Sequence, residues 1–377
     1  MINVGITGQP GFIGTHLYNT LGLYPDEFKR IHFEDSFFQD DTSLRGFVKN
    51  CDTIVHLAAV NRHDSQEVLY QTNIELVNKI IRACDKSRSK PHIIFSSSIQ
   101  EQLDNFYGKS KKEGRIIFEK WAKQNNASFT ALLIPNVYGP FGRPYYNSVV
   151  ATFCQQLTHN EEPFILNDNE INLIYVGELV DEIIKNIKTG TNRSDPKTRH
   201  IIVSHTSKIK VSELLNLLRN FKHNYFERGE IPSMQNSFHR NLFNTLLCYV
   251  DCSEFFPFKL NMKSDQRGSF VELIKLNSGG QISFSTTKPG IIRGNHFHTR
   301  KAERFAVIKG KAKINIRRVG TNNIHSFLLD GKQPAFVDMP VWHTHNIINT
   351  GNEELFTIFW INEHFNPKDT DTYNEFV

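Results

Sequence analysis

Apolar positions follow two different patterns in the two parts of the chain. From residue 1 to about 245, short apolar runs alternate with longer stretches in which apolar residues recur every three to four positions. The recurring pattern predicts helices at residues 67–84 and 110–125. The short runs are rich in Val, Ile and Phe and predict strands at residues 2–7, 53–59, 92–97 and 129–134. Strands and helices that alternate at this spacing indicate an α/β domain with a parallel sheet.

After about residue 250 the helical pattern ends. Turn signals such as Ser278-Gly279-Gly280 and Lys288-Pro289-Gly290 separate short β-type runs. These runs lie at residues 268–275, 280–286, 304–308, 311–317, 335–338 and 354–360. Many short strands at regular intervals predict an all-β barrel or jelly roll. We therefore expect an α/β domain at residues 1–247, a linker at 248–260 and a β domain at 261–377.

Composition narrows the class of partner. The 377 residues include 44 Lys and Arg against 39 Asp and Glu, so the net charge is +5. This charge is too dilute for a nucleic-acid surface, and it suits an anionic small molecule. The five cysteines are scattered without a CxxC pair, which favours a reducing compartment. With no signal-peptide pattern and no long apolar stretch, we expect a cytoplasmic protein that binds neither membrane nor nucleic acid.

The first predicted strand runs directly into the turn Thr7-Gly8-Gln9-Pro10-Gly11-Phe12-Ile13-Gly14, and a helix is expected to follow. Glycine lets backbone amides approach a pyrophosphate closely, and the helix N-terminus adds its positive dipole end. The turn therefore predicts a dinucleotide site. Its candidate binding residues are Thr7, Gly8, Gly11, Phe12, Ile13 and Gly14.

This T-G-x-x-G-x-x-G pattern resembles that of the extended short-chain dehydrogenase/reductase (SDR) family. Asp52 and His56-Leu57-Ala58-Ala59 resemble its D-x-V-x-H-L-A-A element after the fourth strand, in which the Asp faces adenine. Tyr107 and Lys111 supply its Y-x-x-x-K, and residues 135–140 resemble its N-V-Y-G-P substrate loop. The resemblance implies a doubly wound Rossmann-type sheet. It also implies cofactor contacts by Asp52, Leu57, Ala58, Tyr107 and Lys111.

The Y-x-x-x-K pair has a direct chemical use. Tyr107 and Lys111 are four positions apart, so they lie on one face of a helix. An ammonium group lowers the pKa of a nearby phenol, and Tyr107 is then expected to exchange a proton near neutral pH. Ser98 would orient a substrate carbonyl, with Ser97 as the alternative. SDR sugar dehydratases carry an Asp-Glu doublet after this hydroxyl residue, whereas Ile99-Gln100 stands here, so we do not expect dehydration.

The residues leave the choice between NAD and NADP open. The second strand is expected to end near residues 30–35. A carboxylate about 20 residues after the glycine turn, here Glu34, favours a free ribose 2′-hydroxyl and hence NAD. A nearby Arg or His would instead hold a 2′-phosphate.

The candidate metal-binding and proton-transfer residues of the β half are mostly histidines. His296 and His298 are two apart on a predicted strand, so both project from one face. Together with Glu303 and His345, they resemble the two metal motifs of the cupin superfamily and would bind Zn, Mn, Fe or Ni. The run Arg293-Gly294-x-His296 also resembles the R-G-x-H element of dTDP-sugar 3,5-epimerases, in which the histidine removes a proton beside a ketone. His296 is therefore a candidate both for the base and for a metal ligand.

The neighbourhood of the second cupin motif departs from the family pattern. Trp342 stands where that motif usually has glycine. We expect His325, His343 and His364 at the surface or behind the site.

Along essentially its whole length the chain resembles the CapF-like enzymes of capsular polysaccharide synthesis. Val60-Asn61-Arg62, residues 147–154 and Asp371-Thr372-Tyr373 are among the runs that carry this resemblance. It implies a UDP-linked 2-acetamido-2,6-dideoxy-4-keto-hexose as substrate. The cupin domain would invert C3 from L-arabino to L-lyxo with zinc bound. The SDR domain would reduce the C4 ketone with NADPH to UDP-N-acetyl-L-6-deoxytalosamine, on the route to UDP-N-acetyl-L-fucosamine.

The same resemblance implies a homodimer and three UDP-sugar contacts. These are Asn136, Arg143 and Asn147, with Arg143 suited to the diphosphate. Two other functions stay open: a single-activity SDR reductase or 4-epimerase whose cupin domain serves binding or dimerisation, and a non-enzymatic nucleotide sensor. The set of Ser98, Tyr107 and Lys111 argues against the sensor. The four cupin ligands argue, less strongly, against the single-activity enzyme.

Overall fold

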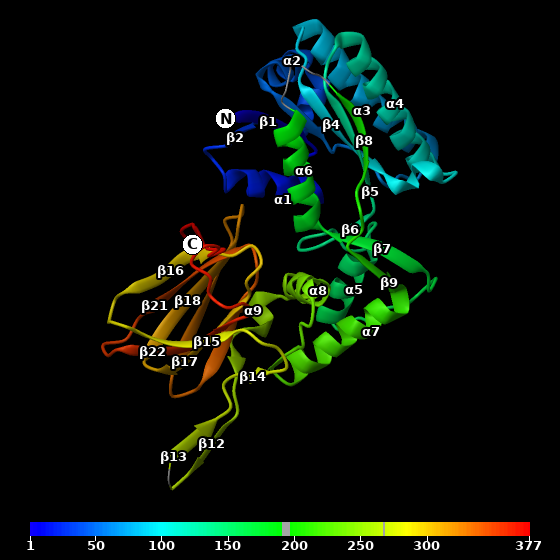
Figure 1. Ribbon diagram of the computed structural model, residues 1–377. Coiled ribbons are helices and arrows are strands. Elements are labelled where there is room, and N and C mark those ends of the chain that lie inside the picture. The colour runs from blue at the N-terminus through cyan, green and yellow to red at the C-terminus, as the bar shows by residue number, and fades with distance from the viewer. Residues whose placement is uncertain (191–196, 267) are drawn as a thin grey trace. The chain divides into compact units, whose positions relative to one another are not determined.

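The computed structural model describes residues 1–190, 197–266 and 268–377, with only the backbone described at 268–270. The chain forms two compact units (Figure 1). Unit 1 comprises residues 1–138, 142–149 and 169–209, and unit 2 comprises residues 139–141, 150–168 and 210–377. The linker expected at 248–260 therefore lies inside unit 2. The extents of the two expected domains stay predictions.

A six-stranded parallel sheet forms the centre of unit 1. Its strand order is β2-β1-β3-β4-β5-β8, and every neighbouring pair is parallel. The strands are β1 (Ile2–Thr7), β2 (Phe28–Ile31), β3 (Thr53–His56), β4 (His92–Ser98), β5 (Phe129–Ile134) and β8 (Thr198–Ile202). Because β2 and β3 lie on opposite sides of β1, the order reverses there. A doubly wound sheet opens its ligand crevice at such a point, at the carboxyl ends of the strands.

Helices cover both faces of this sheet. One layer consists of α2 (Asp41–Asn50), α3 (Gln66–Ser87) and α4 (Phe106–Asn125), and the other of α1 (Phe12–Gly22) and α6 (Val176–Gly190). Neighbouring strand residues serve opposite layers: Ile54 belongs to the first core and Val55 to the second. The strands are therefore continuous apolar runs, as expected for a sheet buried on both faces. The prediction of a doubly wound parallel sheet is confirmed.

Capping side chains set the starts of the two long helices. Ser65 accepts a hydrogen bond from the Val68 amide at 3.3 Å, and Asn105 accepts one from the Gly108 amide at 2.7 Å. The predicted helix at 110–125 therefore begins earlier, and Tyr107 lies in its first turn. Unit 1 also contains the three-stranded sheet β6-β7-β9 and two short helical turns. These are β6 (Asn136–Tyr138), β7 (Glu170–Tyr175), β9 (Ser207–Lys210), η1 (Asp35–Gln39) and η2 (Ile99–Gln102).

Two five-stranded antiparallel sheets dominate unit 2, in the orders β11-β20-β17-β22-β15 and β19-β18-β21-β16-β23. Their strands are β11 (Phe258–Lys259), β15 (Gln281–Thr287), β16 (Ile292–Phe297), β17 (Glu303–Lys309), β18 (Lys311–Arg318), β19 (Ile324–Asp330), β20 (Ala335–Met339), β21 (His343–Asn349), β22 (Leu355–Ile361) and β23 (Tyr373–Asn374). Residues such as Ile314, Ile316 and Phe336 form one buried core. The prediction of an all-β, cupin-like domain is confirmed.

Unit 2 also holds helices and small strand pairs. These are α5 (Val149–Thr158), α7 (Val211–Lys222), η3 (His223–Glu227), α8 (Ser237–Leu247), α9 (Cys252–Phe255), the pair β10 (Glu230–Ile231) and β14 (Lys275–Leu276), and the hairpin β12 (Met262–Asp265) and β13 (Gly268–Val271). The buried guanidinium of Arg304 joins them to the sheets. It pairs with Asp338 at 2.8 Å and donates to the Gly229 carbonyl at 2.9 Å. None of the helices in the described ranges has the length and apolar character needed to cross a membrane.

Candidate active sites

The glycine turn after β1 is packed against the end of β3. Gly8 has φ +69°, and a Cβ there would lie 2.8 Å from the Ala58 nitrogen. A Cβ at Gly14 would overlap the Gly8 carbonyl oxygen. Gly8 therefore requires glycine for backbone conformation and for space, and Gly14 requires it for space.

Helix α1 presents its first amides beside this turn. Its N-cap, Gly11, has no side chain to accept from them, so they are available to an anion. The Leu57 amide donates to the Thr7 carbonyl at 3.2 Å, and the Ala58 amide donates to Thr7 Oγ1 at 3.4 Å. The structure thus gathers the predicted dinucleotide contacts, Asp52 excepted, at the carboxyl end of the sheet.

Thr7 organises this region from within. Its side chain is fully buried, and Oγ1 lies 2.8 Å from His56 Nδ1. Burial, with a smaller contribution from the positive charge of Lys111, lowers the pKa of His56 to about 3. A neutral His56 therefore holds the Thr7 side chain, whose Oγ1 also accepts from the Ala58 amide.

The prediction that Asp52 faces adenine is wrong. Asp52 directly precedes β3, which is the third strand of the chain and not the fourth, and its Oδ2 accepts from the Asn3 amide at 3.0 Å. Asn3 lies near the start of β1, and the register Val4↔Thr53 places Asp52 at the amino end of the sheet. The glycine turn lies at the opposite, carboxyl end.

Tyr107 and Lys111 occupy one face of α4, as predicted. Lys111 Nζ lies 5.7 Å from the centre of the Tyr107 ring and donates to the Ser96 carbonyl at 2.8 Å. Burial lowers the pKa of Lys111 to about 8, against an opposing effect of Glu101. Burial, with a contribution from Tyr146, raises the pKa of Tyr107 to about 12. In the free protein burial therefore shifts the pKa of Tyr107 in the direction opposite to the expected lowering.

The two candidate serines differ in their hydrogen bonds. The hydroxyl of Ser97 donates to the Glu101 carboxylate. Ser98 ends β4, and its Oγ accepts from the Gln100 amide at 3.1 Å as the cap of η2. Among the described residues the Ser98 hydroxyl only accepts, so its O–H is the better placed of the two to donate to a substrate carbonyl.

The loop between Ser98 and Tyr107 is fixed against α4. Glu101 accepts from Arg115 Nε at 2.9 and 3.0 Å. A Cβ at Gly108 would overlap the Gln100 carbonyl oxygen, so η2 packs directly on the first turn of the helix. This packing fixes the position of Tyr107 relative to the end of β4.

The predicted sugar contacts lie on an exposed stretch. Asn136 begins β6, and Arg143 and Asn147 lie in the segment between β6 and α5. The guanidinium of Arg143 lies 5.0 Å from the centre of the Tyr146 ring. Tyr146 is also close enough to Tyr107 to raise its pKa, so it connects the predicted sugar contact with the predicted catalytic tyrosine. Sequence reasoning missed Tyr146, whose one signal is its place beside the substrate-loop motif.

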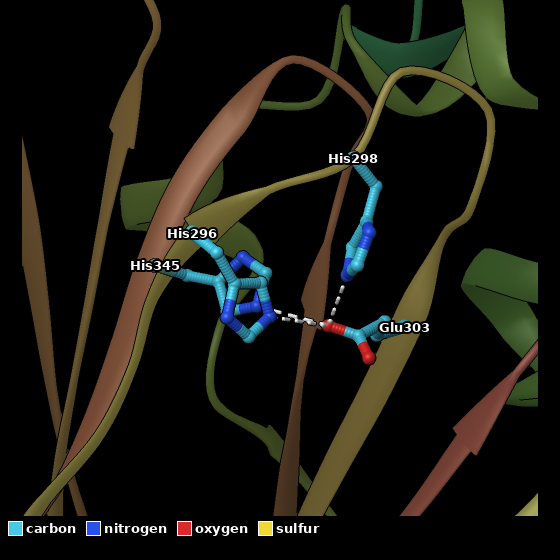
Figure 2. Close-up of side chains that lie close together, drawn as sticks. All are labelled: His296, His298, Glu303 and His345. Atoms are coloured by element: carbon cyan, nitrogen blue, oxygen red, sulfur yellow. Dashed lines mark ion pairs between the residues drawn. The ribbon is translucent and has the colours of Figure 1, made fainter. Parts of the chain in front are cut away.

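In unit 2, His296, His298, Glu303 and His345 converge (Figure 2). His296 lies on β16, His298 follows that strand, Glu303 begins β17 and His345 lies on β21. One ligand atom from each residue lies within 4.8 Å of the others. Glu303 Oε2 is 2.9 Å from Nε2 of His345, 3.2 Å from Nε2 of His298 and 4.0 Å from Nε2 of His296.

Special backbone conformations aim these side chains. Pairing between β16 and β21 shifts register between Gly294 and His296. The residue between them, Asn295, has φ +61°, and its Oδ1 accepts from Asn346 Nδ2 at 2.9 Å. Trp342 has φ +60°, the conformation that glycine adopts easily. Its amide donates to the His298 carbonyl at 2.7 Å, so the turn keeps a glycine-like backbone without the glycine.

The donor atoms of this cluster suit a divalent metal ion. Nε2 of His298, Nε2 of His345 and Oε2 of Glu303 are buried and have no hydrogen-bond partner among the described residues. Buried polar atoms left unpaired are costly, and a metal ion would satisfy all three at once. Zinc bonds of about 2.0–2.1 Å in a tetrahedron separate the ligand atoms by roughly 3.3 Å. The spacings of 2.9, 3.2 and 4.0 Å from Glu303 bracket that value.

The charges within the cluster are strongly coupled. Burial acts to raise the pKa of Glu303, yet the imidazoles of His298 and His345 hold it well below its ordinary value. Burial acts to lower the pKa of His298, yet Glu303 and the Asp371 carbonyl raise it. Burial and the neighbouring His345 lower the pKa of His296 to about 4. Glu303 is therefore an anion among imidazoles, as a metal ligand set requires.

The other three histidines of this half differ in burial. His364 is exposed and His325 half-buried, as expected. His343 is buried behind the cluster, where its carbonyl accepts from His345 Nδ1 at 3.2 Å. It therefore lies behind the site, which was one of the two expected places.

A doubly wound sheet with a glycine turn and a helical Tyr-Lys pair is that of a dinucleotide-dependent oxidoreductase. Family models match both parts of the chain: the NAD dependent epimerase/dehydratase family at residues 4–201, and the polysaccharide biosynthesis C-terminal domain at residues 263–373.

The similarity to known proteins extends over the whole chain. A Pseudomonas aeruginosa protein named UDP-2-acetamido-2,6-beta-L-arabino-hexul-4-ose reductase is 31% identical, over 99% of this chain and 98% of its own length. The crystal structure of the capsular polysaccharide assembling protein CapF from Staphylococcus aureus is 35% identical, with a TM-score of 0.62 and full coverage of both chains. A UDP-glucose 4-epimerase from Thermotoga maritima shares the fold of the first part at 19% identity, with a TM-score of 0.54, 66% of this chain and 98% of that one. The chain therefore belongs to the NAD-dependent epimerase/dehydratase family and, along its whole length, to its CapF-type enzymes.

Proposed function

We propose that this chain is a bifunctional enzyme that acts on a UDP-linked 2-acetamido-2,6-dideoxy-4-keto-hexose. Unit 2 would invert C3 from L-arabino to L-lyxo, and unit 1 would reduce the C4 ketone to give UDP-N-acetyl-L-6-deoxytalosamine. The observation that carries the proposal is the convergence of His296, His298, Glu303 and His345, which a reductase alone does not need. The names of the P. aeruginosa and S. aureus relatives support the substrate class and the place in polysaccharide synthesis.

Reduction needs a proton for the oxygen while a hydride reaches the carbon. Bound NADPH would supply the hydride to C4. Tyr107 would donate the proton to the developing alkoxide, because a phenol with a high pKa holds its proton until that charge appears. Ser98 would orient the carbonyl through its O–H. Lys111, which donates to the Ser96 carbonyl at 2.8 Å, would hold positive charge beside the reacting oxygen.

NADPH is proposed because of the whole-chain resemblance, although Glu34 by itself favours NAD. Glu34 follows β2, and its carboxylate lies 3.1 Å from Nε2 of His32. Comparing kcat/KM for NADPH and NADH tests this choice.

Epimerisation needs a base and a stabilised enolate. The C3–H is acidic because the C4 ketone takes up the charge that its loss leaves behind. A divalent metal, held by His298, His345 and Glu303, would stabilise that negative oxygen. His296 is the most exposed of the four, with 23% of its side chain exposed, so we assign it the proton transfer. Inversion also needs a proton donor on the opposite face of the enolate; solvent water would supply that proton, and His296 would pass the abstracted one to solvent.

The direct test is to incubate the purified chain with the 4-keto UDP-sugar in D2O without NADPH. Deuterium is expected at C3 by NMR, and NADPH added afterwards is expected to be oxidised. If C3 acquires no deuterium while NADPH is still oxidised, the protein is a single-activity reductase. The homodimer and the cytoplasmic location stay predictions.

A further inference from the structure

The C-terminal segment of the chain is built into the ligand cluster of unit 2. Strand β23 pairs with β16, in the register His296↔Asn374 and Phe297↔Tyr373. The Tyr373 ring stacks on that of Phe297, with centroids 5.4 Å apart. The strand that carries His296 is therefore closed on one side by residues about 75 positions later.

Asp371, just before β23, makes the densest set of contacts in this segment. It is only 3% exposed. Its Oδ1 accepts from the Thr299 amide at 3.1 Å and from Thr299 Oγ1 at 2.6 Å. Its Oδ2 accepts from the amides of Arg300 at 3.1 Å and Lys301 at 3.0 Å. One carboxylate thus fixes the turn that joins His298 to Glu303.

The backbone of the same residue contacts His298 directly. The Asp371 carbonyl accepts a hydrogen bond from Nδ1 of the His298 ring. Since a carbonyl can only accept, Nδ1 carries the proton. In the neutral ring Nε2 is then the unprotonated nitrogen, and it is turned toward Glu303, at 3.2 Å from its Oε2. A histidine must present such an unprotonated nitrogen to a metal, and the partner of its other nitrogen fixes the tautomer.

We propose that Asp371 is the positioning residue for the ligand His298. Its carboxylate holds the turn 299–301, its carbonyl holds the ring, and its φ of +44° allows both at once. This proposal rests on the metal site proposed above. It assigns part of that site to a residue far away in the sequence, and it predicts that the affinity for zinc depends on a carboxylate that does not contact the ion.

Asp371→Asn tests the proposal with little disturbance of the backbone. Asparagine tolerates left-handed φ at least as well as aspartate, but its amide nitrogen cannot accept from backbone N–H groups. Zn²⁺ is titrated into the full chain, after chelator treatment, against a competing chromophoric chelator. Loss of an outer partner of a ligand weakens metal binding by about 10–100-fold, which is the expected result. The matched control is Asp369→Asn, whose carboxylate is exposed and contacts Arg300 at 2.7 Å, and which is expected to keep wild-type affinity.

A double-mutant cycle separates positioning from general support. If Asp371 acts through His298, Asp371→Asn costs little further affinity in a His298→Ala background. The visible absorption of bound Co²⁺ is expected to change in Asp371→Asn toward that of His298→Ala. Unchanged zinc affinity in Asp371→Asn overturns the proposal, and so does an equally large loss in the His298→Ala background.

A gentler pair covers the case in which Asp371→Asn does not fold. Thr299→Val removes one donor to the carboxylate, whereas Thr299→Ser keeps it. Zinc affinity is expected to fall severalfold in the first and to stay near wild type in the second, and equal affinities in the two overturn the proposal. A wild-type chain that binds no zinc would instead refute the proposed metal site itself. That outcome is seen in the wild type alone, so it is distinguishable from failure of the Asp371 proposal, which is seen by comparing variants.

Discussion

The Nε2 atom of His345 lies 2.9 Å from Oε2 of Glu303, and both atoms are buried without a hydrogen-bond partner in the described part of the chain. The two residues come from different strands, β21 and β17, which belong to different sheets of unit 2. A buried carboxylate from one sheet that faces imidazole nitrogens from the other is a costly arrangement unless a positive charge compensates it.

Glu303→Gln should therefore reduce metal content sharply. The substitution keeps the shape of the side chain and removes the charge, since Glu303 is ionised at neutral pH in the cluster. We expect zinc affinity to fall at least about tenfold, measured by elemental analysis after dialysis against a weak chelator. The control is Glu353→Gln, an exposed carboxylate 3.7 Å from Lys309. Metal content equal to that of the wild type would remove Glu303 from the ligand set.

Two glycines in helices of unit 1 should respond to alanine in opposite directions. In Gly108→Ala, the new Cβ would overlap the Gln100 carbonyl, so we expect the free energy of unfolding to fall by about 1–3 kcal/mol. Gly46 lies in α2 with nothing within 4 Å of its Cβ position, so Gly46→Ala should raise it by about 0.4–1 kcal/mol. Urea unfolding measures both. A neutral Gly108→Ala would mean that η2 does not pack on α4 as described.

The free energy of unfolding should fall as the pH falls, because buried histidines take up protons more readily in the unfolded chain. Burial lowers the pKa of His92 to about 4 in the folded chain, whereas an unfolded histidine titrates near 6.5. The unfolded chain therefore binds more protons between these values, and this contribution is complete above pH 6.5 and is lost as the pH falls toward 4. We expect His92→Gln to reduce the slope of the free energy of unfolding against pH by up to about 1.4 kcal/mol per pH unit between pH 4 and 6.5. Equal pH slopes of the free energy of unfolding for wild type and His92→Gln would contradict the account.

The sequence alone was enough to predict elements and motifs whose residues are constrained by their near neighbours in the chain. The continuous apolar runs predicted β1 and β5 with correct bounds, because a sheet buried on both faces needs such runs. The glycine turn could be recognised because conformation and close approach restrict Gly8 and Gly14 to one residue type. The two-residue spacing of His296 and His298 placed both on one face.

Properties that depend on distant residues or on burial could not be predicted in the same way. The motif around Asp52 did not reveal at which end of the sheet that residue lies, and the register of β1 with β3 decided it. The pKa of Tyr107 depends on how deeply α4 packs. Asp371 reaches Thr299 across 72 positions, and sequence spacing carries no sign of that contact. The strands β19 and β21 were absent from the predicted runs because His, Asn and Ser interrupt their apolar residues.

The division of labour between the two units is tested most directly by Tyr107→Phe in D2O. The variant keeps the ring and removes only the hydroxyl, with the exposed Tyr24→Phe as its control. With the 4-keto UDP-sugar, we expect NADPH oxidation to fall by about 10²–10⁴-fold, while deuterium enters C3 at the wild-type rate as followed by NMR. Loss of both reactions, or retention of both, would contradict the assignment of reduction to Tyr107 and of epimerisation to the cluster around Glu303.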